Sequence, residues 1–331
     1  MFSLQVLSRS TQTLAPLLEQ AMRFVIHSDL SAFGTSWFAS YVLLSGSPVA
    51  AVSLAFFSSG VLSFSQLFMA VSGSRVGAAF IVVLIGAVEY FRGENEMLRD
   101  SCSIGVLTFL IAYLVYVPAV GLGRLLIARF PVATMLELDL AGLRYSLLLV
   151  FDPFLRAVFS SVPDAGAFVL GFVLLFVSLE VFDMAFKGLR SETFENRYFR
   201  FVMTNTWVSF AAGGLFTLLT TSVSVSLGLI VPLYNRGYLR RKEVIPYILG
   251  SNITTLADTL MAAAVLDTVA GFNAVLLLAG CASLVTLIYL AVYERFYAVL
   301  KMLFDWIISN EKVFAGFAVS LTVFPLLLML L

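Results

Sequence analysis

Small polar residues gather in two matched pairs of clusters, about 175 residues apart, within otherwise hydrophobic sequence. The first pair is Ser45-Gly46-Ser47-Pro48 and Gly73-Ser74-Arg75-Val76-Gly77, and the second is Thr220-Thr221-Ser222 and Gly250-Ser251-Asn252-Ile253-Thr254-Thr255. These residue types weaken or unwind a helix, and a broken helix exposes backbone N–H groups at one new end and carbonyls at the other. The chemistry they indicate is the binding of a small ion.

Either sign of ion could be bound at such breaks. The N–H end of a broken helix carries partial positive charge and suits an anion, and the carbonyl end, with nearby hydroxyl and amide oxygens, suits a small cation. We expect substrate contacts from Ser45, Gly46, Ser47, Arg75, Thr220, Thr221, Ser222, Ser251 and Asn252. The cation ligands would come from Ser47, Ser222, Asn252, Thr254, Thr255 and Asp258. The alternative is close helix packing, for which Gly73-x-x-x-Gly77 suffices by itself.

Two charged residues lie within this apolar sequence. Asp258 follows Asn252 by six residues, and Arg75 occupies the place of Asn252 in the first copy. An ionisable residue at membrane depth costs about 3 kcal/mol or more if it is unpaired, so it indicates a function by default. In one interpretation Arg75 binds an anion and Asp258 accepts a proton or cation. In the other, the two form a buried pair that holds the helices together.

Composition places the chain among membrane proteins. Of 331 residues, 60% are hydrophobic and 12% are charged, and the formal net charge is zero. A soluble domain would have about twice that charged fraction. Nothing indicates nucleic-acid binding, a bound cofactor, a nucleophile–base pair or a metal cluster, so we do not expect an enzyme. Cys102 and Cys281 lie in apolar segments and are not expected to form a disulfide. The N-terminus lacks the order of a signal peptide.

Apolar stretches long enough to cross a bilayer recur along the chain. They predict an all-α, polytopic integral membrane protein of the cell (inner) membrane, with two inverted-topology repeats that contain broken or re-entrant helices. We divide the chain into an N-terminal amphipathic segment, a first transport repeat, an interfacial connecting region, a second transport repeat and a C-terminal transmembrane helix: 1–32, 33–123, 124–165, 166–297 and 298–331.

Basic residues argue that the two copies are inverted. The segment from Ser58 to Gln66 contains no charged residue, whereas its counterpart from Tyr234 to Glu243 contains Arg236, Arg240, Arg241 and Lys242. Lys and Arg concentrate in cytoplasmic loops. Equivalent loops on opposite sides of the membrane imply inverted repeats, whose binding site lies near the bilayer midplane.

The second copy resembles the repeat of type II sodium/phosphate cotransporters and their bacterial relatives. The similar residues are Pro246, Leu249, Gly250, Ser251, Asn252, Ile253 and Thr255, within a repeat that reads approximately P-x-x-L-G-[AS]-N-I-G-T-T. The first copy is similar more weakly, and the resemblance covers roughly 34–90 and 166–266. It implies a divergent, shortened, prokaryotic-type member of the family.

The resemblance implies secondary transport of an inorganic anion, phosphate first, coupled to sodium or protons, with sodium as the cation at the ligands given above. The departures from the family are the glutamines missing from both Ser/Thr clusters, Arg75 in place of Asn, and Thr254 in place of Gly. Two alternatives stay open, an uncoupled anion channel or exporter on the same scaffold and a non-transporting membrane scaffold protein. The expected partners are phosphate or a related anion, sodium or protons, the lipid bilayer and a second copy in a homodimer.

Overall fold

The protein is an assembly of helices, several of them long enough to cross a membrane. The computed structural model describes residues 2–91, 101–132, 141–187, 203–235, 238–266 and 268–331, and every element with bounds in these ranges is a helix. Five helical segments are long and apolar enough to span a bilayer: Phe64–Leu84, Ser103–Arg129, Arg241–Val265, Val269–Ala291 and Glu311–Leu330. At this level the expected all-α membrane class is confirmed.

Two sets of five helices follow the same order. The first half of the protein contains α2 (Asp29–Val42), α3 (Gly46–Ser58), α4 (Phe64–Ala78), α5 (Phe80–Phe91) and α7 (Ser103–Arg129). The second half contains α11 (Thr206–Thr220), α12 (Val223–Asn235), α13 (Arg241–Thr254), α14 (Leu256–Val265) and α15 (Val269–Ala291). Helices α3 and α12 begin at residues 46 and 223 and end at 58 and 235, so both ends are 177 positions apart.

Local chemistry repeats at the same spacing. Leu44 and Thr221 each have φ of 49°, and they are the only non-glycine residues in the left-handed region among those described. They end α2 and α11 at equivalent places. Helix α4 starts with the Gln66 side chain accepting the N–H of Ser63, and α13 starts with Glu243 accepting the N–H of Arg240. In both places the side chain satisfies an N–H group that has no partner within the helix.

The glycines of the second clusters serve close packing. A Cβ on Gly73 would lie 2.2 Å from the Phe33 carbonyl oxygen, and a Cβ on Gly250 would lie 2.0 Å from that of Phe210. Small residues allow helix backbones to approach this closely. The expectation that the chain breaks at 73–77 is wrong in detail, because these residues are helical and the break follows at Ala79. In the second cluster, Gly250 to Thr254 are helical and the break lies at the last residue, Thr255.

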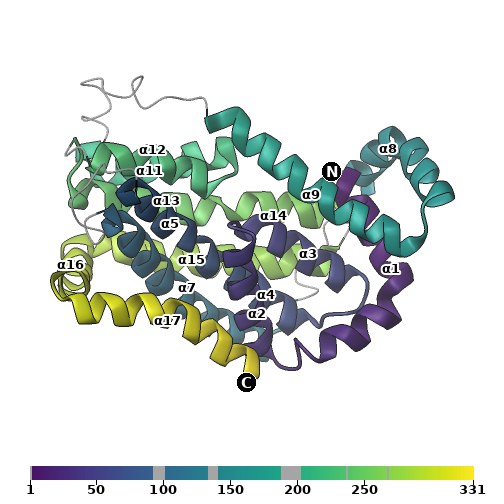
Figure 1. Cartoon of the computed structure of the whole chain (residues 1–331), viewed down its shortest axis with the longest axis horizontal. Helices are drawn as coiled ribbons and strands as arrows, with labels where there is room; N and C mark the ends of the chain where they lie inside the picture. Colours follow the sequence, from purple (N-terminus) through teal and green to yellow (C-terminus); the bar gives the residue numbers. More distant parts are fainter. Residues whose placement is uncertain (1, 92–100, 133–140, 188–202, 236–237, 267) are drawn as a thin grey trace.

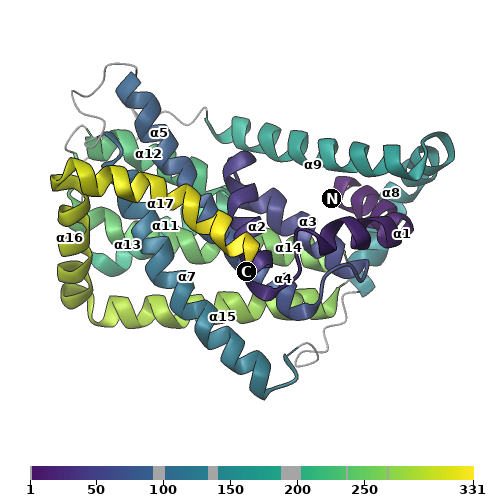
Figure 2. The ribbon, with the colours of Figure 1, turned by 60° about the horizontal axis from the view of Figure 1, so that its bottom comes forward.

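The two halves pack against each other reciprocally. Helix α3 of the first half contacts α14 of the second, and α12 of the second half contacts α5 of the first. In the same way α4 contacts α15, and α13 contacts α7. In Figure 2, α3 and α14 are beside each other to the right of the centre, and α5 and α12 are beside each other at the upper left. For these two pairs of helices, a contact in one direction has its counterpart in the other.

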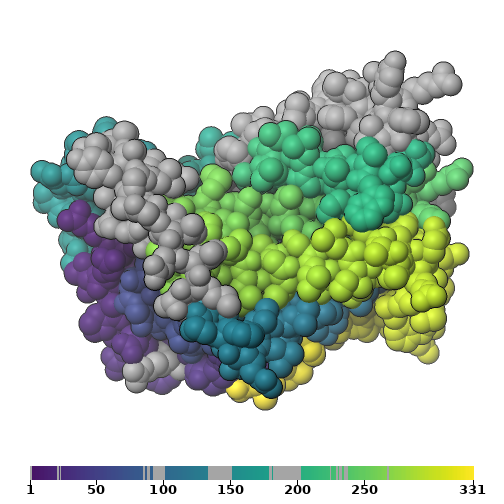
Figure 3. Space-filling model, turned by 180° about the vertical axis from the view of Figure 1, so that it is seen from behind, coloured from purple at the N-terminus to yellow at the C-terminus, as the bar shows by residue number. Residues whose placement is uncertain are grey.

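The remaining helices lie around this centre. They are α1 (Phe2–Arg23), α8 (Ala141–Ser161), α9 (Asp164–Lys187), α16 (Tyr293–Ser309) and α17 (Glu311–Leu330). Figure 1 shows α1 and α8 at one end of the long axis and α16 at the other, and Figure 3 shows the α1 and α16 ends from behind. Helix α17 is the C-terminal apolar helix that the sequence predicts. Residues 133–140 of the expected connecting region lie outside the described residues.

The equivalent loops of the two halves lie at these opposite ends. At the end of α3, the Ser58 hydroxyl lies 3.2 Å from that of Ser8 on α1. After α12, Arg241 pairs with Asp305 at 2.8 Å and Lys242 with Glu294 at 2.6 Å, both partners being on α16. Arg236, the other basic residue of that loop, lies outside the described residues. The loop rich in basic residues and its uncharged counterpart are thus at different ends of the molecule.

Candidate functional site

A buried ion pair joins the two halves where their helix breaks meet. Arg75 lies one turn before the end of α4, and Asp258 lies in the first turn of α14. Arg75 Nη2 is 3.5 Å from Asp258 Oδ1, and the side chains are 1% and 13% exposed. The two intramembrane charges singled out from sequence are therefore partners. Each offsets the cost of burying the other.

The Arg75 guanidinium also binds the second-half break itself. Nη1 donates to Thr255 Oγ1 at 3.1 Å and to the Thr255 carbonyl at 3.3 Å. Nη2 donates to Thr259 Oγ1 at 2.6 Å, and the Thr259 hydroxyl in turn donates to Asp258 Oδ1 at 2.8 Å. Oxygen atoms of the break that could have surrounded a small cation are here bound to a guanidinium.

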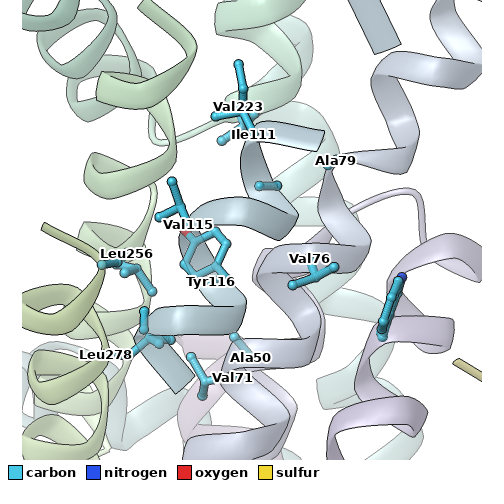
Figure 4. Close-up of a cluster of buried hydrophobic side chains, with 14 of the residues drawn as sticks. Ala50, Val71, Val76, Ala79, Ile111, Val115, Tyr116, Val223, Leu256 and Leu278 are labelled. Atoms are coloured by element: carbon cyan, nitrogen blue, oxygen red, sulfur yellow. The ribbon is translucent and has the colours of Figure 1, made fainter. Parts of the chain in front are cut away.

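Tyr116 of α7 satisfies another carbonyl near this break. Its hydroxyl donates to the Asn252 carbonyl at 2.6 Å. A carbonyl freed by a helix break inside a membrane protein needs a donor from a neighbouring element. Figure 4 shows Val115 and Tyr116 of α7 with Val76 of α4 on one side and Leu256 of α14 on the other. Apolar side chains of both halves therefore lie beside the polar cluster.

Three polar atoms of this cluster are buried without a hydrogen-bond partner within the described part of the chain: Arg75 Nε, Asn252 Nδ2 and Asp258 Oδ2. Leaving such a group unsatisfied costs about 1–3 kcal/mol, and more for a charged one. Two of the three are donors and one is an acceptor.

The first-half break at Ser45–Ser47 packs beside Arg75. A Cβ on Gly46 would lie 2.4 Å from the Ser74 carbonyl oxygen and 3.0 Å from the Ala78 side chain. Helix α3 begins at Gly46, after the turn at Leu44, with Ser45 at its N-cap. Ser45 and Ser47 are both partly exposed. The cluster therefore contacts α4 at Ser74, the residue next to the buried arginine.

The second-half hydroxyl groups bond mainly within their own half. Thr220 donates to the Phe216 carbonyl, Ser251 donates to that of Gly213, and Thr254 donates to that of Gly250. Ser222 Oγ accepts the N–H of Val225, and Thr221 supplies the left-handed turn. Within the part of the chain that the structure describes, none of these hydroxyl groups is hydrogen-bonded to Arg75. The predicted substrate and sodium ligands thus divide into two groups, and Arg75, Asn252, Thr255 and Asp258 form the group between the halves.

Two members of the cluster escaped sequence reasoning. Thr259 lies four residues after Thr255, so it shares a helix face with it, and this spacing could have identified it. Tyr116 is one aromatic residue within a long apolar segment, and nothing local to it signals a role.

Comparison with known proteins adds no assignment. Neither a family model, nor a curated protein, nor a solved structure matches this chain.

Proposed function

We propose that the two halves are inverted-topology repeats with helices broken at membrane depth. The matched helix bounds, the reciprocal packing and the equivalent loops at opposite ends support this interpretation. Helices α2 and α3 have 14 and 13 residues, which corresponds to about 20 Å each and is too short to cross a bilayer core of about 30 Å. Re-entrant helices have this length.

We propose further that the protein is a secondary transporter of an inorganic anion, with phosphate as the first candidate, like the sodium/phosphate cotransporters whose repeat it resembles. The observation that carries this proposal is the Arg75 cluster at the meeting point of the halves, with three unsatisfied polar atoms. In inverted-repeat transporters, discontinuous helices form the substrate site at this place.

The unsatisfied atoms suit a protonated oxyanion. Monobasic phosphate has anionic oxygens that can accept from Arg75 Nε and Asn252 Nδ2, and an O–H that can donate to Asp258 Oδ2. Sulfate and chloride have no proton to donate to that carboxylate at neutral pH. Phosphate therefore matches the hydrogen-bonding needs of the site better than either.

Charge balance favours protons as the coupling ion. The Arg75–Asp258 pair is neutral, so adding one anion alone would leave a net charge in a low-dielectric site. One cation taken up with each monobasic phosphate keeps the complex neutral, and a proton needs no shell of oxygen ligands. The Thr255 and Thr259 oxygens that could bind sodium already accept from Arg75. The uptake experiment below therefore also compares a sodium gradient with the proton gradient.

Phosphate uptake into proteoliposomes tests the proposal. We expect accumulation driven by an inward proton gradient, and a fall of about 10- to 100-fold in Arg75→Asn, because a hydrogen bond between charged groups contributes about 1.5–3 kcal/mol. Arg295→Asn, an exposed arginine on α16, is the matched control. Uptake driven only by a sodium gradient would show that sodium, and not the proton, is the coupling ion. Equilibration of phosphate without any gradient would indicate a channel or exporter.

The same ion pair also supports a purely structural role, since it holds the halves together without any ligand. Folded, correctly inserted protein that neither transports nor binds phosphate, sulfate or sodium would establish the scaffold alternative and reject transport.

A further inference from the structure

A polar cavity lies away from the ion pair, at the end of the molecule that contains α1. Its volume is about 240 Å³. Helix α1 contributes one polar face, α8 contributes an acidic and an apolar residue, and the end of α14 closes the cavity; the lining residues are Gln5, Ser8, Arg9, Gln12, Asp152, Leu155, Val265 and Leu266. The first four have spacings of three, one and three residues, so they lie on one side of α1.

Gln5 is the buried polar residue that lines this cavity. Its side chain is buried, with the residue 8% exposed, and within the described residues its Oε1 has no hydrogen-bond partner. A buried carbonyl oxygen of this kind is usually satisfied by protein or by a bound molecule. A partner for Gln5 Oε1 must be a hydrogen-bond donor.

Arg9 supplies a positive charge at the same cavity. Its guanidinium carbon lies 5.1 Å from the centroid of the Phe159 ring of α8, which holds the cation beside the cavity. The acidic lining residue, Asp152, is paired with Arg156 of the same helix. With that carboxylate paired, Arg9 is the lining cation that can receive an anionic oxygen.

The two requirements together define the ligand chemistry. Arg9 favours a ligand with anionic oxygens, and Gln5 favours one with an acidic O–H or N–H. A phosphate group with a donor meets both, as in monobasic phosphate or in a phosphoethanolamine headgroup. The cavity has the volume of about eight water molecules, which is enough for a phosphate group.

We propose that the cavity between α1, α8 and the end of α14 is an outer phosphate-group site, with Arg9 binding the anionic oxygens and Gln5 accepting from the ligand. Asp258 lies near the start of α14 and Val265 at its end, seven residues or about 10 Å away. If the proposed transport function holds, on which this last step rests, the cavity is the vestibule from which phosphate reaches Arg75. The ligand is either free phosphate or the headgroup of a phospholipid.

The experiment measures binding rather than transport. Delipidated protein in detergent is titrated with inorganic phosphate by calorimetry, and native mass spectrometry records retained phospholipid. The variants are Arg9→Gln, which alters an exposed side chain and should fold, and Gln5→Leu; Arg295→Gln is the charge-matched control at the opposite end. For the free-phosphate source, we expect Arg9→Gln to weaken the outer site about tenfold, as loss of a charged hydrogen bond implies.

The outcomes separate the sources and the two proposals. Phosphate binding that persists in Arg75→Asn but is weakened in Arg9→Gln assigns an outer site for free phosphate, whether or not transport is found. Phospholipid retained by the wild type and lost in Arg9→Gln and Gln5→Leu, without binding of inorganic phosphate there, assigns the headgroup. If both ligands bind equally to the wild type, Arg9→Gln and Gln5→Leu, the outer site does not exist.

Discussion

The two helix breaks have nearly the same backbone and different side chains. Helix α4 ends before Ala79 and α13 before Thr255, after glycines that pack in the same way on α2 and α11. At positions 75 and 252, which are 177 residues apart, one half has arginine and the other asparagine. Helix packing therefore constrains Gly73 and Gly250 in the same way. The ionisable groups, by contrast, are divided, with the cation in one half and the carboxylate in the other.

Removing one member of the buried ion pair should have the largest effect on stability. We expect Arg75→Leu and Asp258→Leu each to lower the free energy of unfolding by about 3–5 kcal/mol, because each leaves one buried charge unpaired. The double variant should lose much less than the sum, since it leaves no charge. Thermal unfolding in detergent, analysed as a double-mutant cycle, measures the coupling. Additive losses would mean that the two side chains do not stabilise each other.

Glycine substitutions test whether the close helix contacts are equivalent in the two halves. We expect Gly73→Ala and Gly250→Ala to destabilise by about 3 kcal/mol each, because the new Cβ atoms would lie 2.2 and 2.0 Å from carbonyl oxygens and overpacking is costly. Gly280→Ala, where a Cβ meets nothing within 4 Å, is the control and should be close to neutral. Unfolding temperatures compare the three. Clearly unequal losses in the two halves would contradict equivalent packing.

The left-handed turns should show the smallest effect. We expect Leu44→Gly and Thr221→Gly each to raise the free energy of unfolding by about 1 kcal/mol, because glycine adopts φ of 49° without the steric cost that a Cβ imposes. Leu43→Gly, whose φ is −90°, should instead destabilise. Chemical denaturation of the three variants is the measurement. Opposite signs at Leu44 and Thr221 would show that the turns are not equivalent.

Much of the architecture could be predicted from the sequence because it depends on local pattern. Long apolar stretches predict spanning helices, and Ser45–Ser47 and Thr220–Ser222 mark the turns between α2 and α3 and between α11 and α12. The positions of the later breaks were less accurate. The Gly73–Gly77 cluster stays helical, because its small residues are used for contact with α2 and not for unwinding.

By itself, the sequence determined the helical membrane class and identified Arg75 and Asp258 as charges within apolar sequence, since composition and spacing are local properties. Only the tertiary structure decided which polar residues meet. Arg75 reaches Thr255, Thr259 and Asp258 of the other half, whereas Ser251 and Thr254 bond within their own half. The physical reason is that neighbouring residues on a helix point in directions about 100° apart. The packing of α3 and α4 against α14 and α15 selects which of those directions faces the site.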